Sequence, residues 1–202
     1  PTGKLIVIEG LDGGGKKTQS DLLYNHLLQK GYKTKLISFP IYDTPAGKLI
    51  AAYLGGEIGG RNDLPPEIPA LFYTLDRYQV KWDLEKLLKE GNIVILDRYS
   101  PSNLAFQGAK IPSVKKRQKF LSWLEKVESR LPIPDLILYL NVPIKNIKEW
   151  IAQRFQRPFE LTAIKDIHER DFAYQKQVQK LYITLAKQHG WSIINYQNKQ
   201  RK

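Results

Sequence analysis

A glycine-rich loop near the start of the chain has the residue types that bind a polyphosphate. It lies between an apolar run and a segment with helical spacing, which is the strand–loop–helix context of a phosphate-binding loop. Glycines let backbone N–H groups turn inward around phosphate oxygens, and the N-terminus of the following helix adds a partial positive charge. We predict that the loop binds phosphates through Gly10, Leu11, Asp12, Gly13, Gly14, Gly15, Lys16, Lys17 and Thr18.

The loop departs from the G-x-x-x-x-G-K-[ST] pattern at one position. The hydroxyl that would hold Mg²⁺ is replaced by Lys17, and Thr18 comes one residue later, about 100° around the helix. Two arrangements are open: Lys17 turns away from the nucleotide, or its ammonium takes over part of the charge neutralisation. We favour the first, because a nearby cation repels a flexible lysine. A glycine-rich turn without a ligand is the remaining alternative.

The composition narrows the class of protein. The chain has 202 residues, no cysteine and a formal net charge of +12, so we expect a single domain over residues 1–202 without disulfides. No apolar run reaches membrane-spanning length and the start does not resemble a signal peptide, so we expect a cytoplasmic protein. The basic clusters at 115–119 and 199–202 lack interleaved aromatics, so we read them as solvated surface and expect no nucleic-acid partner.

Apolar runs alternate with helical patterns along the chain, which predicts an α/β fold with a doubly wound parallel sheet flanked by helices. Ligands of such sheets bind beyond the carboxyl ends of the strands, so the pairs Glu9-Gly10, Phe39-Pro40 and Asp97-Arg98 should line one cleft. The expected strands cover residues 5–8, 36–39, 93–96, 136–140 and 193–196. The expected helices cover residues 16–30, 65–89, 114–131, 144–155 and 166–189.

Four further segments, together with residues 9–19, resemble the thymidylate kinase family in the same order along the chain. They are residues 39–47, 70–77, 97–108 and 131–143, and the most specific is Asp97-Arg-Tyr followed by Ala105-Phe-Gln-Gly. The resemblance extends from about Lys4 to Tyr196. It implies a P-loop nucleoside monophosphate kinase fold with a short helical lid near 152–161, ATP and Mg²⁺ as donor and cofactor, dTMP as acceptor, and a homodimer.

The resemblance also implies a role for each matching side chain. Phe72 would stack on thymine, Arg77 would donate to a base carbonyl, and Phe106 would crowd the sugar 2′ position. The catalytic set would be Asp12, Lys16, Arg98, Arg154 and Arg157, with Asp97 near the metal or its waters. The dTMP-binding set would be Asp12, Phe39, Tyr42, Phe72, Arg77, Arg98, Asn103, Phe106, Gln107 and His168.

Each assignment has a structural alternative. Phe72 could belong to the core, and Arg98 could form a surface ion pair. Asp97 could cap a turn or a helix, and the two lid arginines could lie at a solvated helix C-terminus. Two departures from the family weaken the match: Ile41 replaces a frequent arginine, and His168 a common tyrosine. The alternative functions are another deoxynucleotide or nucleoside kinase, or a P-loop protein that binds nucleotides or polyanions with little turnover.

Overall fold

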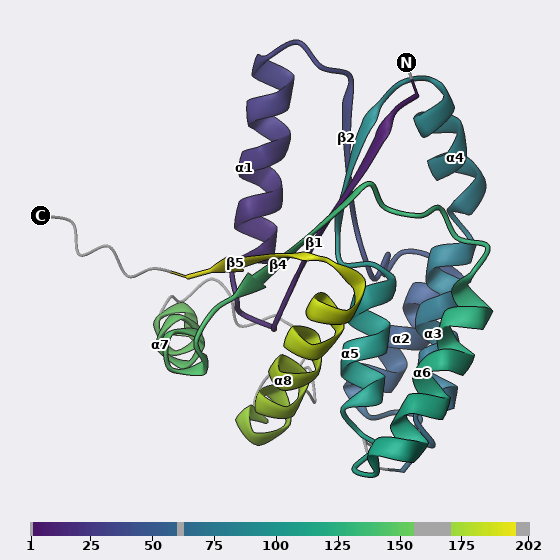
Figure 1. Cartoon of the computed structure of the whole chain (residues 1–202), viewed down its shortest axis with the longest axis vertical. Coiled ribbons are helices and arrows are strands. Elements are labelled where there is room, and N and C mark those ends of the chain that lie inside the picture. Colours follow the sequence, from purple (N-terminus) through teal and green to yellow (C-terminus); the bar gives the residue numbers. More distant parts are fainter. Residues whose placement is uncertain (1, 60–62, 156–170, 197–202) are drawn as a thin grey trace, which may run out of the picture.

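The core of the fold is a five-stranded, all-parallel sheet with the strand order β2-β3-β1-β4-β5 (Figure 1). The computed structural model describes residues 2–59, 63–155 and 171–196, with the side chains of 154 and 155 left out. This arrangement confirms the predicted doubly wound sheet. The strands are β1 Lys4–Gly10, β2 Thr34–Ser38, β3 Ile93–Asp97, β4 Leu136–Asn141 and β5 Ser192–Asn195.

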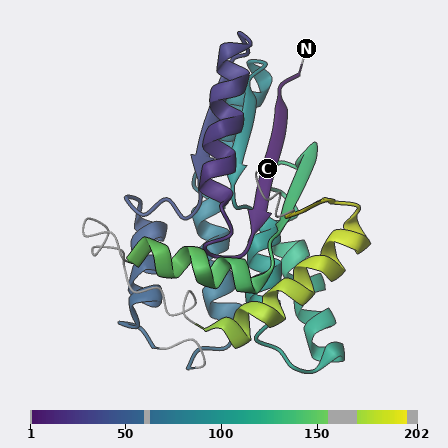
Figure 2. The same ribbon diagram turned by 90° about the vertical axis from the view of Figure 1, so that its left-hand side faces the viewer.

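Helices cover both sides of this sheet. Helices α1 and α7 lie on one side, while α3, α4, α5 and α6 lie on the other (Figures 1 and 2). Helix α8 packs against α5 and β4. The described helices are α1 Lys16–Gln29, α2 Pro45–Gly55, α3 Glu67–Tyr78, α4 Lys81–Lys89, α5 Ser100–Gly108, α6 Val114–Glu128, α7 Ile144–Phe155 and α8 Phe172–His189.

The single helix predicted over residues 65–89 is wrong, because the chain turns between α3 and α4. Val80 has φ −104° and ψ 4°, outside the helical region, and its β-branched side chain favours helices weakly. The Gln79 amide donates to Asp76 Oδ1 at 2.8 Å and to Thr44 Oγ1 at 2.8 Å, which fixes the turn. The turn allows α3 to pack on α2 and α5 while α4 packs on β3.

Two short helices, α2 and α5, lie in segments for which no helix was predicted from the sequence. Thr44 caps α2 by accepting from the Gly47 N–H at 3.1 Å, and Pro45 occupies its first turn. Pro101 occupies the first turn of α5 in the same way. Helix α8 ends at Gly190 in the left-handed conformation, as predicted, whereas the predicted start at 166 lies outside the described residues.

Three apolar clusters hold the layers together. The largest joins α5, α6, α7 and α8 to β4, a second joins β1 and β3 to α4, and a third joins α2 to α3. Burying one leucine or valine side chain stabilises the fold by about 1.5–3 kcal/mol. Together they give the carboxyl ends of β1, β2 and β3 a rigid base.

Candidate active site

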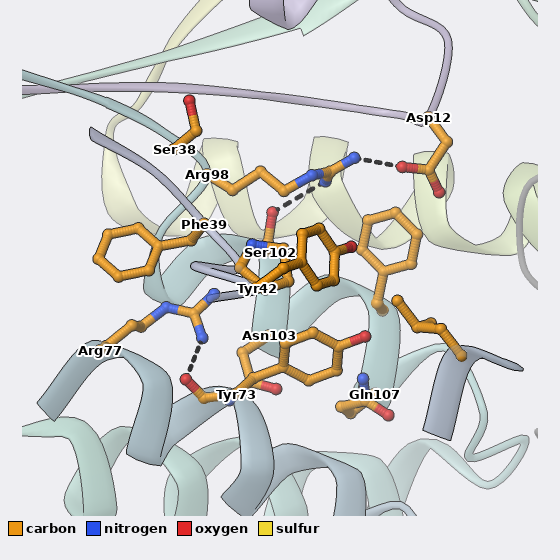
Figure 3. A pocket seen from close by; sticks show the side chains of 13 residues that line it. Asp12, Ser38, Phe39, Tyr42, Tyr73, Arg77, Arg98, Ser102, Asn103 and Gln107 are labelled. Atoms are coloured by element: carbon orange, nitrogen blue, oxygen red, sulfur yellow. Dashed lines mark hydrogen bonds and ion pairs between the residues drawn. The ribbon is translucent and has the colours of Figure 1, made fainter. Parts of the chain in front are cut away.

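A cavity of about 350 Å³ lies beyond the carboxyl ends of β1, β2 and β3, between α2, α3 and α5 (Figure 3). Eight of the ten residues predicted to bind dTMP line it; Phe72 does not, and His168 lies outside the described residues. Four lining residues were not predicted from the sequence: Ser38, Leu54, Tyr73 and Ser102. The complete lining is Asp12, Ser38, Phe39, Pro40, Tyr42, Leu54, Tyr73, Arg77, Arg98, Ser102, Asn103, Phe106 and Gln107.

The glycine-rich loop connects β1 to α1 as predicted. Lys16 is buried and its Nζ donates to the Leu11 carbonyl at 2.7 Å, so the ammonium is folded back inside the loop. Burial, together with the nearby Arg98 charge, lowers the pKa of Lys16 to about 8. Gly13 has φ +72°, where a side chain is strained, and a Cβ there would lie 2.9 Å from the Ile151 side chain of α7.

Lys17 points away from the loop. Its Nζ pairs with Asp21 Oδ2 at 2.7 Å, one helical turn further along α1, and the side chain is exposed. The structure therefore has the first of the two arrangements that the sequence left open. Thr18 is exposed too.

Arg98 joins the phosphate loop to the cavity. Its guanidinium forms an ion pair with the Asp12 carboxylate, and it donates to Ser102 Oγ at 3.1 Å and to the Gly10 carbonyl at 3.4 Å (Figure 3). Burial alone would lower the pKa of Arg98, but Asp12 and the other anionic neighbours raise it above its usual range. Its φ of 70° is unusual for a residue with a side chain and is a feature typical of functional sites.

A fully buried carboxylate lies beneath Arg98 and corrects one expectation. Glu9 does not line the cleft; it accepts hydrogen bonds from the Tyr99 and Ser102 N–H groups at 2.8 and 3.1 Å. It also accepts from Ser102 Oγ at 2.6 Å and from the Tyr182 hydroxyl at 2.8 Å. Burial raises its pKa, and these hydrogen bonds and the Arg98 charge oppose the rise. An acidic residue ending an apolar strand was the signal available in the sequence.

Three buried polar atoms beside the cavity have no hydrogen-bond partner. They are Arg77 Nε, Asn103 Oδ1 and Gln107 Oε1, so they offer one donor and two acceptors. The rest of the Arg77 guanidinium is held by the carbonyls of Tyr73 at 2.6 Å and Tyr99 at 2.7 Å. Because buried polar groups nearly always have partners, these three atoms indicate a ligand site.

The aromatic side chain at this end of the cavity is Tyr73, not Phe72. Phe72 packs against Tyr53 at a ring-centroid distance of 6.3 Å, in the cluster between α2 and α3. Adjacent helical residues project about 100° apart, and of these two it is Tyr73 that lines the cavity. Phe39 and Phe106 also line it, and the Arg98 guanidinium lies 5.3 Å from the Phe106 ring centroid.

Asp97 fits the predicted role near Mg²⁺. It ends β3, its Oδ1 is buried without a hydrogen-bond partner, and its negative charge opposes the lowering of the Lys16 pKa. Mg²⁺ is usually held by one or two carboxylates together with phosphate oxygens and water. Of the predicted lid, Arg157 lies outside the described residues, and Arg154 is described by its α7 backbone alone.

A family model described as thymidylate kinase matches residues 8–202. The chain is 33% identical over 198 residues to a thymidylate kinase of Arabidopsis thaliana, covering 96% of this chain and 65% of that protein. It is 37% identical over 187 residues to a probable thymidylate kinase of Pyrococcus horikoshii, covering 91% and 83%. The human thymidylate kinase is 34% identical over 171 residues, covering 83% and 76%.

A solved structure has the same fold. The thymidylate kinase of Candida albicans superposes with a TM-score of 0.77 at 29% identity, covering 96% of this chain and 84% of that one. Within the described parts of this chain, no helix combines the length and apolarity needed to cross a membrane.

Proposed function

The chain belongs to the thymidylate kinase family, and we propose that it transfers the γ-phosphoryl group of ATP to dTMP, giving ADP and dTDP. The observation that carries the proposal is the Arg98–Asp12 ion pair, because it joins the phosphate loop to a cavity of nucleoside size. An acceptor phosphate beside Arg98 would therefore lie next to the donor phosphates.

At the phosphate end, the residues position charge rather than perform covalent chemistry. Backbone N–H groups of the loop and Lys16 hold the ATP phosphates. Arg98 binds the dTMP phosphate through its guanidinium fork. Asp12 holds that guanidinium in place until the acceptor arrives. An oxygen of the dTMP phosphate then attacks the γ-phosphorus, and the bond to the ADP oxygen breaks.

At the base end, the unpartnered atoms match thymine. Arg77 Nε donates to a base carbonyl, and Asn103 Oδ1 accepts from the N3–H group. Tyr73 takes the stacking role that the sequence assigned to Phe72, with Phe39 and Tyr42 completing the walls. Phe106, which lines the cavity, would crowd a 2′-hydroxyl and so favour deoxyribose.

Several parts of the proposal rest on family membership and stay predictions. Asp97 would hold Mg²⁺ directly or through water, and the metal would neutralise charge on the transferring phosphate. Arg154, Arg157 and His168 would act from the lid side, and the location would be cytoplasmic. A homodimer is supported by a stripe of exposed apolar side chains on α3: Ile68, Leu71 and Leu75.

A coupled assay of ADP release with each nucleoside monophosphate and nucleoside tests the proposal. We expect dTMP to give the highest kcat/KM. A different preferred acceptor would favour another nucleoside or nucleotide kinase. Nucleotide binding without ADP release, together with polyanion binding that weakens steeply with salt, would favour the non-catalytic alternative.

A further inference from the structure

A buried carboxylate outside the cavity controls one of the side chains that line it. Glu128 lies at the end of α6 with 7% of its surface exposed. Its Oε1 accepts from Asn103 Nδ2 at 2.8 Å and from Thr74 Oγ1 at 2.8 Å. Carboxylates are rarely buried this deeply unless they are hydrogen-bonded or paired, so this one has a specific role.

Acceptors from two helices surround the Asn103 amide nitrogen. Besides Glu128, the Ala70 carbonyl lies 3.0 Å and Thr74 Oγ1 3.3 Å from Nδ2. A carboxylate and a carbonyl can only accept, so they require the NH₂ group on this side. The flipped amide would place Oδ1 against both acceptors. Oδ1 is therefore fixed on the opposite side, where it has no hydrogen-bond partner.

Because the amide is fixed, Asn103 offers a base only a hydrogen-bond acceptor, its Oδ1. We propose that Glu128, together with the Ala70 carbonyl, sets selection of thymine over cytosine by fixing the amide of Asn103, a lining residue, so that its unpartnered Oδ1 is left for the base. Thymine carries a donor at N3, which Oδ1 accepts. Cytosine carries an acceptor at N3, which Oδ1 repels, leaving two buried acceptors facing each other. The inference rests on the proposed dTMP site.

Glu128→Gln tests this role with nearly unchanged shape. A glutamine can donate as well as accept, so only the Ala70 carbonyl still requires the NH₂ group, and the Asn103 amide turns more readily to present NH₂ to cytosine. We expect the ratio of kcat/KM for dTMP to that for dCMP to fall about tenfold, and the ratio of their binding constants by calorimetry to fall likewise. Both ratios are independent of the folded fraction, so loss of stability alone does not move them.

Thr74→Val is the matched control. It removes the hydrogen bond from Thr74 to the same carboxylate and the longer 3.3 Å contact from Asn103 to Thr74, but leaves in place the two acceptors that require the NH₂ group, Glu128 and the Ala70 carbonyl. Its dTMP:dCMP ratio should equal that of the wild type. If Glu128→Gln does not fold, Glu128→Asp replaces it: the shorter acid withdraws from Asn103 and should lower the ratio in the same direction.

The failures of this inference and of the proposed function are distinguishable. A wild-type enzyme that phosphorylates dTMP selectively, combined with an unchanged ratio in the Glu128 variants, overturns the role of Glu128 alone. An equal fall in Thr74→Val also overturns it, because the effect would then be one of general packing. A wild type that turns over no monophosphate overturns the proposed function itself.

Discussion

Tyr139 and Tyr182 stack with their ring centroids 4.8 Å apart, yet only one of the two hydroxyl groups makes a hydrogen bond to Glu9. The Tyr182 hydroxyl donates to Glu9 Oε2 at 2.8 Å and lies 3.0 Å from Ser102 Oγ, which accepts from Arg98. The Tyr139 hydroxyl is buried without a hydrogen-bond partner. The pair therefore separates the effect of the hydrogen-bond network from that of removing a buried hydroxyl.

We expect Tyr182→Phe to raise the KM for dTMP and to lower the free energy of unfolding by about 1.5–3 kcal/mol, the worth of a hydrogen bond to a charged group. Arg98 then loses part of the support that reaches it through Ser102. Tyr139→Phe removes a buried hydroxyl that has no partner, so it should not lower the free energy of unfolding and should leave KM unchanged. Steady-state kinetics and urea titrations check both. Equal KM values in the two variants would contradict the network.

Lys16 should impose a limit on activity at alkaline pH. Its pKa in the folded protein is about 8, so the free enzyme loses the phosphate-binding charge above that pH. We expect kcat/KM for ATP to fall about tenfold per pH unit above pH 8, because this constant reports the free enzyme. The alkaline fall in kcat should begin at a higher pH than the fall in kcat/KM, since bound phosphates favour the charged form of Lys16. A flat kcat/KM profile to pH 10 would exclude this assignment.

The lowered pKa of Lys16, which reduces activity at alkaline pH, makes a contribution to stability that increases with pH. The folded pKa lies below the ordinary value of 10.5, so between about pH 8 and 10.5 the unfolded chain binds more protons than the folded one. The Lys16 contribution to the free energy of unfolding therefore increases with pH across this window. Comparing the wild type with Lys16→Met by urea titration at several pH values isolates that contribution.

Lys17→Thr should lower the concentration of free Mg²⁺ that gives half-maximal rate. The variant restores a hydroxyl where the phosphate-loop pattern has one, and it removes the Lys17–Asp21 ion pair, which is exposed and worth no more than about 0.5 kcal/mol. Asp21→Asn is the control, because it breaks the same ion pair without adding a hydroxyl. Activity titrated against free Mg²⁺ measures the effect. Identical half-maximal Mg²⁺ concentrations in the wild type and both variants would show that Lys17 does not affect metal binding.

Tyr73→Ala should reduce kcat/KM for dTMP by about 5- to 150-fold, because stacking on a base is worth about 1–3 kcal/mol. Its neighbour provides the control: Phe72→Ala removes an aromatic of similar size from the α2–α3 cluster, so it should lower stability while affecting dTMP less. Kinetics and thermal unfolding of both variants decide the assignment. A larger kinetic loss in Phe72→Ala would return the stacking role to Phe72.

The sequence predicted the local features that depend on short segments. Five apolar runs without alternation indicated the five parallel strands, and the glycine loop before Lys16 indicated the phosphate site. The division of the helix over 65–89 was not visible, because the turn at Val80 is fixed by a contact from Gln79 to Thr44, a residue far away in the sequence. The start signals of these two helices were present in the sequence: Thr44-Pro45 for α2 and Pro101 in the first turn of α5.

The sequence by itself determined which residue types gather at the carboxyl edge of the sheet, since parallel strands end at one edge. Only the tertiary structure decided which side chains face the cavity and how they are oriented. The rotation of α3 exposes Tyr73 to the cavity and packs Phe72 away from it. The approach of α6 places Glu128 against the Asn103 amide. Both follow from packing between helices, which no local sequence pattern encodes.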